Sequence, residues 1–357
     1  MFPQVHLDIP DQEDLLDKFK RILETGWLSE GPYTKQYVEE CSVYLGIPNL
    51  LPVPNGTLGL YLALSVAKKN WGVGDLLIPS FTFYGSASPA VALGFNPVFV
   101  DCDQNSFQSG IEQFASRATR STVGIMPIHI YGQLTNMHEL CEWAKGNGYF
   151  VIEDCAQAFG ASVNGAGAGT FGDMAVFSTF SDKALPTGEG GLIGTSNADL
   201  YREIKYQRNQ GREHSGTFFH QEWGMNFRIT DMQAAVGLHF LKRYSEELRR
   251  RRKIYSNYLE QTILKGIETM AVSDIDAMVP FRFPLLSNNY ERTKHNLEKN
   301  GFQTRGFFKP LHKQPKFAEF GPDYLANCEA ISSKGFCMPV HSLVTAQTIE
   351  QQLECVE

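Results

Sequence analysis

The amino-acid sequence predicts an α/β fold with a mainly parallel central sheet that is flanked by helices. Short apolar runs alternate with amphipathic stretches through the first half of the chain, and this alternation is typical of parallel strands joined by right-handed helical crossovers. Two of these apolar runs end in acids, at Asp101–Asp103 and at Glu153–Asp154. Ligands of open α/β sheets bind outside the carboxyl ends of the strands. The length of 357 residues allows one large domain and one smaller domain.

The first elements follow from periodicity and from turn residues. Residues 11–25 have apolar positions at helical spacing and acids in the first turn, which predicts a helix that stops at Gly26. A turn at Gly31–Pro32 precedes a second helix that ends near Gly46. Further along, the pattern predicts in order a loop over 52–57, an apolar helix, a strand over 75–79, a loop over 80–84, a helix over 86–93, a strand over 96–103, a helix near 109–118, a strand over 121–132 that ends at His129 and Tyr131, a helix over 137–148 and a central strand over 149–155.

The second half of the chain is less regular. Residues 214–231 are rich in glycine and aromatic side chains and predict an irregular segment, and a long, bent helix follows it. We place a domain boundary in that helix, with a large domain over 1–240 and a smaller C-terminal α/β domain over 241–357. The other predicted elements are strands over 175–180, 192–196 and 277–286, helices over 198–211 and 290–301, loop-rich segments over 304–315 and 335–345, and a final helix.

Composition excludes several classes of protein. The net charge of −7 argues against a nucleic-acid partner, and the basic run 249–253 follows acids in a helical pattern and predicts a solvated face. No stretch reaches the length of a membrane span. The N-terminus lacks the basic region and apolar core of a signal peptide. The seven cysteines are scattered and lack CxxC spacing, which predicts reduced thiols in a cytoplasmic protein and no metal site.

The stretch 151–191 carries the candidate chemistry. Asp154 ends one predicted strand and Lys183 follows another, so both side chains can reach one crevice. Each alone has an ordinary explanation, a turn or cap residue for the aspartate and a solvated side chain for the lysine. Ser178 and the glycines at 188–191 add a hydroxyl and open backbone for a phosphate. A carboxylate for a pyridine nitrogen and an amine for a Schiff base are what pyridoxal 5'-phosphate requires.

Two further features fit a cofactor and also have simpler explanations. Gly56 and Thr57 open an apolar helix and offer N–H groups, a hydroxyl and the positive end of the helix dipole to an anion. A simple N-cap explains the same residues. Phe81, Phe83 and Tyr84 lie between a strand and a helix, where one ring can stack on a planar cofactor or all three can belong to the core.

The chain resembles the DegT/DnrJ/EryC1/StrS family of pyridoxal-phosphate nucleotide-sugar aminotransferases, which have the aspartate aminotransferase (type I) fold. The resemblance covers nearly the whole chain. It rests on nine segments in the family's order: GWLSEGPYTKQYVEE (26–40), NGTLGLYLAL (55–64), IPSFTFYGSASPAVALGFNPVFVDCD (78–103), PIHIYGQLTNM (127–137), VIEDCAQAFGA (151–161), GTFGDMAVFSTFSDKALPTGEGG (169–191), MNFRITDMQAAVGLHFL (225–241), FKPLHKQP (308–315) and MPVHSLVT (338–345).

The resemblance implies a role for each matching residue. Lys183 forms the Schiff base, Asp154 pairs with the ring nitrogen, Gln157 lies near the phenolic oxygen and Phe83 stacks on the ring. The remaining implied contacts are Gly56, Thr57, the Leu58 N–H and Ser178 at the phosphate, Asn226 at the phosphate of a neighbouring subunit in an obligate homodimer, and His129, Tyr131, His312 and Gln314 near the substrate.

Three positions and the last helix depart from the family's pattern or are ambiguous. Leu58 replaces a small residue, which a backbone donor tolerates, and Asp182 beside Lys183 is unusual and is expected to perturb the pKa of the lysine. His341 matches a position near the cleft, but we favour a packed loop histidine. The helix after it is short, which leads us to expect a trimmed carboxyl end.

The implied activity is transamination with L-glutamate as amino donor. Our first choice of acceptor is dTDP-4-keto-6-deoxy-glucose, which gives dTDP-4-amino-4,6-dideoxy-glucose for a surface polysaccharide such as lipopolysaccharide O-antigen. A GDP- or UDP-linked keto sugar and amination at C3 are alternatives. A sugar dehydratase of the same fold is disfavoured because it carries histidine in place of Lys183. A non-catalytic regulator of this fold is a different class, and an oxidoreductase is disfavoured because no GxGxxG follows the first strand.

Overall fold

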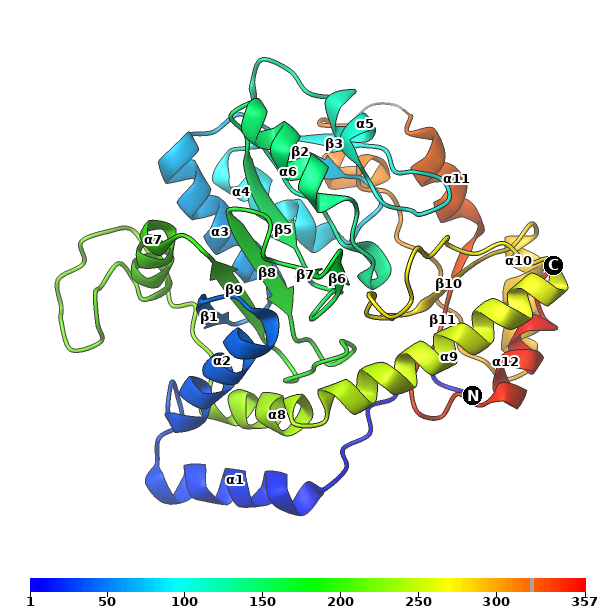
Figure 1. Ribbon diagram of the computed structural model, residues 1–357, viewed down its shortest axis with the longest axis horizontal. Coiled ribbons are helices and arrows are strands. Elements are labelled where there is room, and N and C mark those ends of the chain that lie inside the picture. Colours follow the sequence, from blue (N-terminus) through cyan, green and yellow to red (C-terminus); the bar gives the residue numbers. More distant parts are fainter. Residues whose placement is uncertain (322–323) are drawn as a thin grey trace.

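The computed structural model describes residues 1–321 and 324–357 and is built on a seven-stranded sheet (Figure 1). The strand order is β1-β9-β8-β5-β4-β2-β3. Strand β9 runs antiparallel to both neighbours, and the other adjacent strands are parallel. The mainly parallel sheet is therefore confirmed. Its strands are β1 (Asn49–Val53), β2 (Asp75–Pro79), β3 (Asn96–Val100), β4 (Thr122–Ile125), β5 (Phe150–Asp154), β8 (Met174–Ser178) and β9 (Gly191–Thr195).

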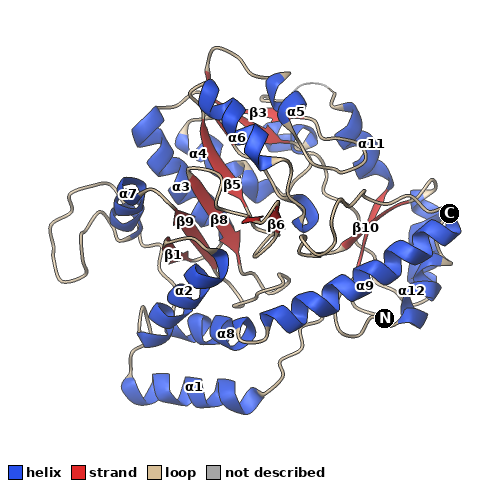
Figure 2. Ribbon diagram, in the orientation of Figure 1, coloured by secondary structure: helices blue, strands red, loops and turns tan. Residues whose placement is uncertain are grey.

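Helices cover both faces of the sheet, because successive side chains of each strand point to opposite faces (Figure 2). Val176 of β8 joins one hydrophobic cluster with Leu60 of α3, and its neighbour Phe177 joins a second cluster with Tyr37 of α2. The helices around the sheet are α2 (Pro32–Leu45), α3 (Gly56–Trp71), α4 (Ser88–Leu93), α5 (Ile111–Ala115), α6 (Met137–Gly146) and α7 (Ala198–Arg208).

The helix α1 (Gln12–Thr25) and α2 end where the sequence predicts. Gly26 and Gly46 follow them in the left-handed conformation, with φ of 68° and 69°, and glycine adopts this conformation without a steric penalty. The N–H of each glycine donates to a carbonyl of the last turn, Ile22 O and Ser42 O. These caps fix where the chain leaves each helix.

The strand predicted over 121–132 is shorter than expected, and this corrects its end. Strand β4 ends at Ile125, and Ile128 makes only an isolated bridge with Asp154. Residues Ile130–Gly132 form a 3-10 turn in which Tyr131 has a positive φ of 54°. His129 therefore lies in an extended segment beside the end of β5, and Tyr131 lies in a turn.

The C-terminal part packs around a small antiparallel sheet of β10 (Phe283–Leu286) and β11 (Gly335–Met338). The predicted long helix is two helices, α8 (Asp231–Leu241) and α9 (Tyr244–Lys265), and α9 runs from the large sheet toward the small one (Figure 1). The domain boundary at 240/241 stays a prediction. One hydrophobic cluster includes both Val176 of the large sheet and Phe283 of the small sheet, so the two parts share a core. The remaining elements are β6 (Ser162–Val163), β7 (Ala166–Gly167), α10 (Tyr290–Lys299), α11 (Ala326–Lys334) and α12 (Ala346–Leu353).

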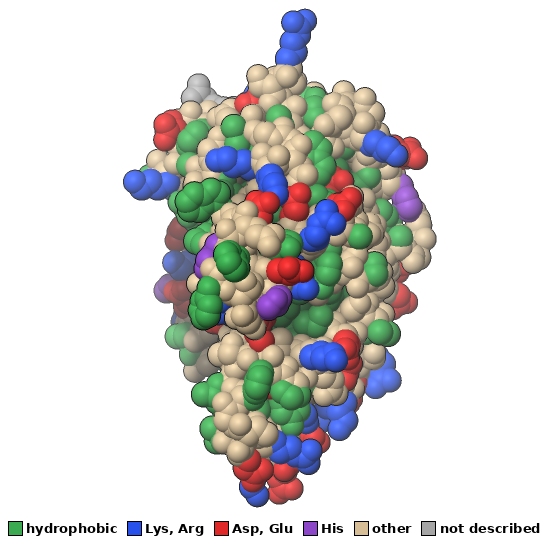
Figure 3. Space-filling view, turned by 90° about the vertical axis from the view of Figure 1, so that its left-hand side faces the viewer, with side chains coloured by type: hydrophobic (Ala, Val, Ile, Leu, Met, Phe, Trp, Pro, Cys, Tyr) green, Lys and Arg blue, Asp and Glu red, His purple; other side chains and the backbone are tan. Residues whose placement is uncertain are grey.

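The irregular region predicted over 214–231 has no helix or strand up to Thr230, and Asp231 begins α8. The chain between α7 and α8 projects from the body beside α7 (Figure 1). We call residues 209–228 the projecting segment. Its three most exposed aromatic side chains, Phe218, Phe219 and Trp223, are 89%, 80% and 93% exposed. Figure 3 views this side of the molecule and shows hydrophobic side chains on its surface. No helix in the described part of the chain is both long and apolar enough to cross a membrane.

Candidate active site

Asp154 is the last residue of β5, and its carboxylate is buried and well held. One oxygen accepts from Ser86 Oγ at 2.7 Å, and the other accepts from the Ala156 N–H at 3.0 Å. Burial raises the pKa of Asp154, while these two hydrogen bonds and the charge of Lys183 lower it in part. Both hydrogen bonds stabilise the ionised form. The site thus presents a fixed carboxylate that is ready to pair with a cation.

Lys183 lies on the loop after β8, and its side chain is 17% exposed. Its amine lies 3.7 Å from Asp182 Oδ1 and 4.2 Å from the centre of the Phe281 ring. Burial lowers the pKa of Lys183, whereas Asp182 and Asp154 raise it. A buried amine loses its proton more readily than a solvated lysine. The predicted influence of Asp182 on the pKa is therefore present.

Lys183 and Asp154 line the same cavity, which has a volume of about 460 Å³. The cavity lies at the carboxyl ends of β5 and β8, where the sequence places it. Its lining also includes Gly56, Thr57, Leu58, Phe83, Gln157, Ser178 and His129 from the predicted set, together with Asn55, Thr82, Gly85, Ser86, Asp182, Glu189, Phe281, Arg305 and Phe308.

The start of α3 forms a narrow anion cradle opposite Ser178. A Cβ on Gly56 would lie 3.1 Å from Ser178 Cβ, and a Cβ on Gly85 would lie 2.6 Å from Thr57 Oγ1. These glycines let the backbone approach the two hydroxyls. The N-cap interpretation is also correct, because Asn55 Oδ1 accepts from the Leu58 N–H at 2.9 Å. The resemblance assigns the Leu58 N–H to the phosphate, but in the structure this N–H donates to Asn55.

The flat walls of the cavity come from Phe83 and Gln157. Phe83 is 61% exposed and touches the Phe308 ring only edge-on, with 6.3 Å between the ring centroids. One ring face is thus left for a planar ligand. Gln157 Oε1 accepts from the Tyr131 N–H at 2.8 Å, which fixes the side-chain amide at the cavity. Their roles toward a cofactor stay predictions.

His129 lines the cavity and is held by the acid next to Asp154. Its Nε2 lies 3.1 Å from Glu153 Oε2, and its Nδ1 is buried with no partner among the residues that the structure describes. Glu153 points to the opposite face of β5 and accepts from the backbone N–H groups of Gly169, Phe171 and Gly172 at 2.7–2.9 Å. The second acid at the end of the strand, Glu153, thus holds both a loop and the His129 ring in place.

Three residues predicted near the substrate are not among the described residues that line this cavity. Tyr131 is fully buried, with its hydroxyl 3.5 Å from Cys337 Sγ. His312 is buried between Ser80 and Glu329, and the Gln314 side chain donates to the Lys309 carbonyl. Their contact with substrate stays a prediction. His341 is a packed histidine, as we favoured, because it is buried and its Nε2 lies 2.9 Å from the Pro3 carbonyl.

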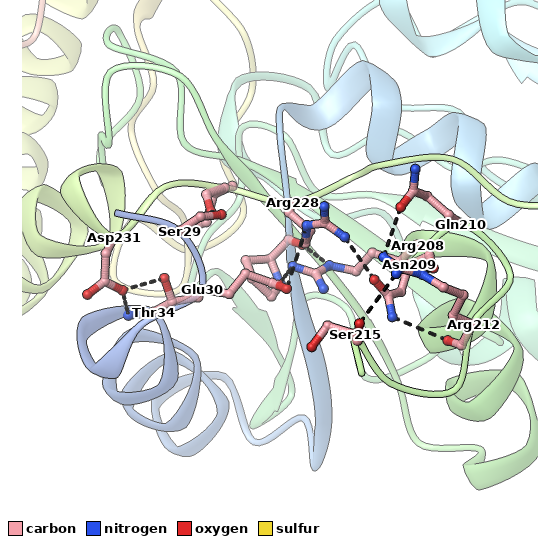
Figure 4. A network of polar contacts seen from close by, with 12 residues as sticks. Ser29, Glu30, Thr34, Arg208, Asn209, Gln210, Arg212, Ser215, Arg228 and Asp231 are labelled. Carbon is pink, nitrogen blue, oxygen red and sulfur yellow. Dashed lines mark hydrogen bonds and ion pairs between the residues drawn. The ribbon is translucent and has the colours of Figure 1, made fainter. Parts of the chain in front are cut away.

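Asn226 lies on the projecting segment, exposed, and outside the described lining of the cavity. An ion-pair network holds the base of the segment (Figure 4). Buried Arg208 donates to Glu30 and to the Pro52 carbonyl. Arg228 lies 3.8 Å from the other oxygen of Glu30 and donates to Asn209 Oδ1 at 2.8 Å. The backbone around Asn226 is therefore held in place, and the Asn226 side chain is exposed.

Sequence reasoning missed Ser86, Phe281 and Arg305. Ser86 contacts Asp154, Phe281 lies under the Lys183 amine, and Arg305 approaches Asp182 at 3.6 Å. Each is far from its partner along the chain. Nothing in the local sequence TRGFFKP indicates that Arg305 lies near Asp182, so this contact could be found only from the fold.

Comparison with known proteins identifies the class. Residues 10–357 match the model of the DegT/DnrJ/EryC1/StrS aminotransferase family. The GDP-perosamine synthase of Caulobacter vibrioides is 31% identical over 344 residues, 94% of this chain and 92% of the synthase. The dTDP-3-amino-3,6-dideoxy-alpha-D-galactopyranose transaminase of Aneurinibacillus thermoaerophilus is 30% identical over 350 residues, 97% and 95% of the two chains. The crystal structure of the sugar aminotransferase CalS13 from Micromonospora echinospora superposes with a TM-score of 0.91 at 27% identity and covers 99% of both chains.

The chain belongs to the DegT/DnrJ/EryC1/StrS aminotransferase family and has its type I fold. It is a sugar aminotransferase that depends on pyridoxal phosphate. The cavity fits this cofactor, because a buried amine, a buried carboxylate, an exposed ring face and a glycine-opened cradle surround one space.

Proposed function

We propose that the protein transfers the amino group of L-glutamate to a nucleotide-linked keto sugar. The observation that carries this proposal is the convergence of Lys183 and Asp154 on one cavity that also holds an anion cradle. The coarser activity, sugar amination with pyridoxal phosphate, is that of the family. To this activity the proposal adds L-glutamate as the amino donor and a nucleotide-linked keto sugar as the acceptor.

Two side chains manage the protons of the reaction. Bound pyridoxal phosphate supplies an electron sink through which an amino group passes between an amino acid and a ketone. Asp154 would hold a proton at the ring nitrogen, and the hydrogen bonds from Ser86 and Ala156 favour the charged form of its carboxylate. Lys183 contributes the amine that anchors the cofactor and then moves a proton to and from the substrate. Its lowered pKa increases the neutral fraction that this transfer requires.

The other walls of the cavity bind and orient the cofactor. Thr57 and Ser178 hold the phosphate at the positive end of α3. Phe83 stacks on one ring face, and the fixed amide of Gln157 meets the phenolic oxygen. The Asn226 side chain of one subunit reaches the phosphate in the other, so the working unit is a homodimer with shared sites. The anchored projecting segment supports that geometry.

The likeness to a GDP-perosamine synthase favours a GDP-linked 4-keto sugar over the dTDP-4-keto-6-deoxy-glucose of our first choice. The likeness to a dTDP-sugar transaminase keeps the dTDP-linked sugar and C3 amination as alternatives. The proposal includes a cytoplasmic enzyme that makes an amino sugar for a surface polysaccharide.

The experiment is a panel of GDP-, dTDP- and UDP-linked keto sugars with L-glutamate, in which 2-oxoglutarate and the amino sugar are measured together. We expect one nucleotide series to turn over and the others to be at least about ten times slower, since a site built for one set of polar groups rejects another. Protein that binds pyridoxal phosphate but whose absorbance does not respond to glutamate would support the non-catalytic regulator instead.

A further inference from the structure

The Lys183 amine is surrounded by charged side chains from several parts of the chain. Asp182 is its neighbour on the loop after β8, and Asp154 is the last residue of β5. Arg282 comes directly before β10, and Arg305 is paired through its backbone with β11. The two acids raise the pKa of Lys183, while burial and the two arginines lower it. The protonation of this amine therefore depends on how these side chains are held.

Arg282 is buried, and both ends of its guanidinium are engaged. Its Nη1 donates to the Gln4 carbonyl at 3.1 Å, and its Nη2 donates to Asp182 Oδ2 at 2.9 Å. The Gln4 N–H donates to Gln303 Oε1 at 3.0 Å, so the backbone that accepts from Arg282 is itself held. The Arg282 side chain is only 4% exposed. Because solvent screens a buried ion pair little, this contact fixes the carboxylate more firmly than a surface pair would.

The contact with Arg282 decides where the Asp182 carboxylate points. Oδ2 is engaged by Arg282 and is approached by Arg305 Nη1 at 3.6 Å. Oδ1 is buried, has no hydrogen-bond partner in the described part of the chain, and lies 3.7 Å from the Lys183 amine. This distance is longer than the roughly 2.7–3.2 Å of an N–H···O hydrogen bond. A carboxylate released from Arg282 needs to move by only about 1 Å to bind the amine directly.

We propose that Arg282 is a positioning residue that holds the Asp182 carboxylate out of hydrogen-bond contact with the Lys183 amine and so keeps that amine free to bond to the cofactor. This inference rests on the role that the proposed function gives to Lys183. A direct hydrogen bond from an ammonium group to a carboxylate favours the protonated form of the amine. Only the neutral amine has the lone pair that attacks the aldehyde carbon of pyridoxal phosphate, a condensation that releases water. The N-terminal segment takes part, because its Gln4 carbonyl holds the other end of Arg282.

The test measures how fast the full-length apoprotein takes up pyridoxal phosphate as a function of pH, and it requires no turnover. In Arg282→Gln the Asp182 carboxylate is released toward the amine and a nearby positive charge is lost, so the pKa of Lys183 rises. We therefore expect the acid limb of the uptake rate to move up by about one pH unit. Arg282→Lys keeps the positive charge but lacks the planar fork of donors, and we expect it to recover only part of the shift.

A double variant separates positioning from the charge of Arg282 alone. In the Asp182→Asn background no carboxylate remains to turn toward the amine. We expect Arg282→Gln to move the acid limb there by less than about a third of its effect in the wild-type background. An equal shift in both backgrounds would overturn the inference, because the arginine would then act on Lys183 only through its charge. If Arg282→Gln does not fold, Arg282→Lys in the same two backgrounds provides the comparison.

Arg251→Gln is the matched control. Arg251 is also buried and also binds a carboxylate and a carbonyl, those of Glu247 and Pro280. We expect its acid limb to match that of wild type, and a wild-type limb in Arg282→Gln would contradict the inference.

Uptake by Lys183→Ala as fast as by wild type would instead overturn the role of Lys183 in the proposed function. Since all variants are compared in the same assembly, charges from a partner subunit act on each of them alike.

Discussion

The cavity at the end of β5 and the projecting segment differ in whether their side chains have partners within the same chain. In the cavity, Asp154 and Gln157 each have a hydrogen-bond partner within the same chain. In the projecting segment, the network around Arg208 fixes the base, while Trp223 is 93% exposed. Grouped exposed hydrophobic side chains often mark an interaction surface. Asp154 and Gln157 are thus held within one chain, whereas the aromatic side chains of the projecting segment are exposed.

This contrast separates residues that act within one chain from residues that act across two. Lys183 and Asp154 are expected to control chemistry in any assembly state. Asn226 and the exposed aromatic residues are expected to matter through the partner subunit. Substitutions in the two regions should therefore change different observables.

The largest effect is expected for Lys183→Ala. Loss of the amine removes both the attachment of the cofactor and the proton transfer, and general acid–base catalysis alone contributes about 10²- to 10⁴-fold. We expect glutamate-dependent sugar amination to fall by at least about 10³-fold, with the dimer intact in sedimentation. Lys299→Ala, at the exposed end of α10, is the control. A Lys183→Ala variant that retains a tenth of the activity would contradict the assigned role.

The next effect is expected for Asp154→Asn. The amide keeps the size of the side chain but cannot pair with a cation at the ring nitrogen, and an adjacent opposite charge is worth about 1–3 pKa units. We expect kcat to fall by roughly 10- to 1000-fold, as measured by steady-state assay. Ser86→Ala removes only the 2.7 Å hydrogen bond to this carboxylate, and about a fivefold loss is expected. A larger loss in Ser86→Ala than in Asp154→Asn would refute this order.

A change in the projecting segment should weaken assembly first. Trp223→Ala removes a large exposed aromatic side chain, and tryptophans at the centre of an interface typically contribute about 2 kcal/mol or more. We expect the dimer dissociation constant in sedimentation equilibrium to rise by about 30-fold. Leu264→Ala, 78% exposed on the last turn of α9, is the control. A Trp223→Ala dimer as tight as wild type would place the interface elsewhere.

The smallest effect is a shift in pH dependence for Asp182→Asn. The Asp182 carboxylate raises the pKa of Lys183 against the lowering by burial. Without it the pKa of Lys183 falls, so the neutral amine is present at lower pH. The acid limb of the rate at which the apoprotein takes up pyridoxal phosphate should move down by about one pH unit. An unchanged limb, or one that moves up, would show that Asp182 does not control this amine.

The fold class and the two central residues were predictable because they depend on local patterns. An apolar run that ends in Asp154, and a second run followed by Lys183, place both side chains at one edge of a parallel sheet. The direction of β9 and the early end of β4 were not predictable. They depend on which strands pair across the sheet, and short apolar runs do not encode that choice.

The sequence by itself determined the alternation of elements, the acid and amine at the strand ends, and the family to which the chain belongs. Tertiary structure alone decided that Ser86 holds Asp154, that Glu153 binds a backbone loop, and that Arg305 approaches Asp182. The physical reason is that hydrophobic periodicity is written along the chain. Hydrogen bonds and ion pairs between distant residues instead exist only after the packed helices and strands bring those residues together.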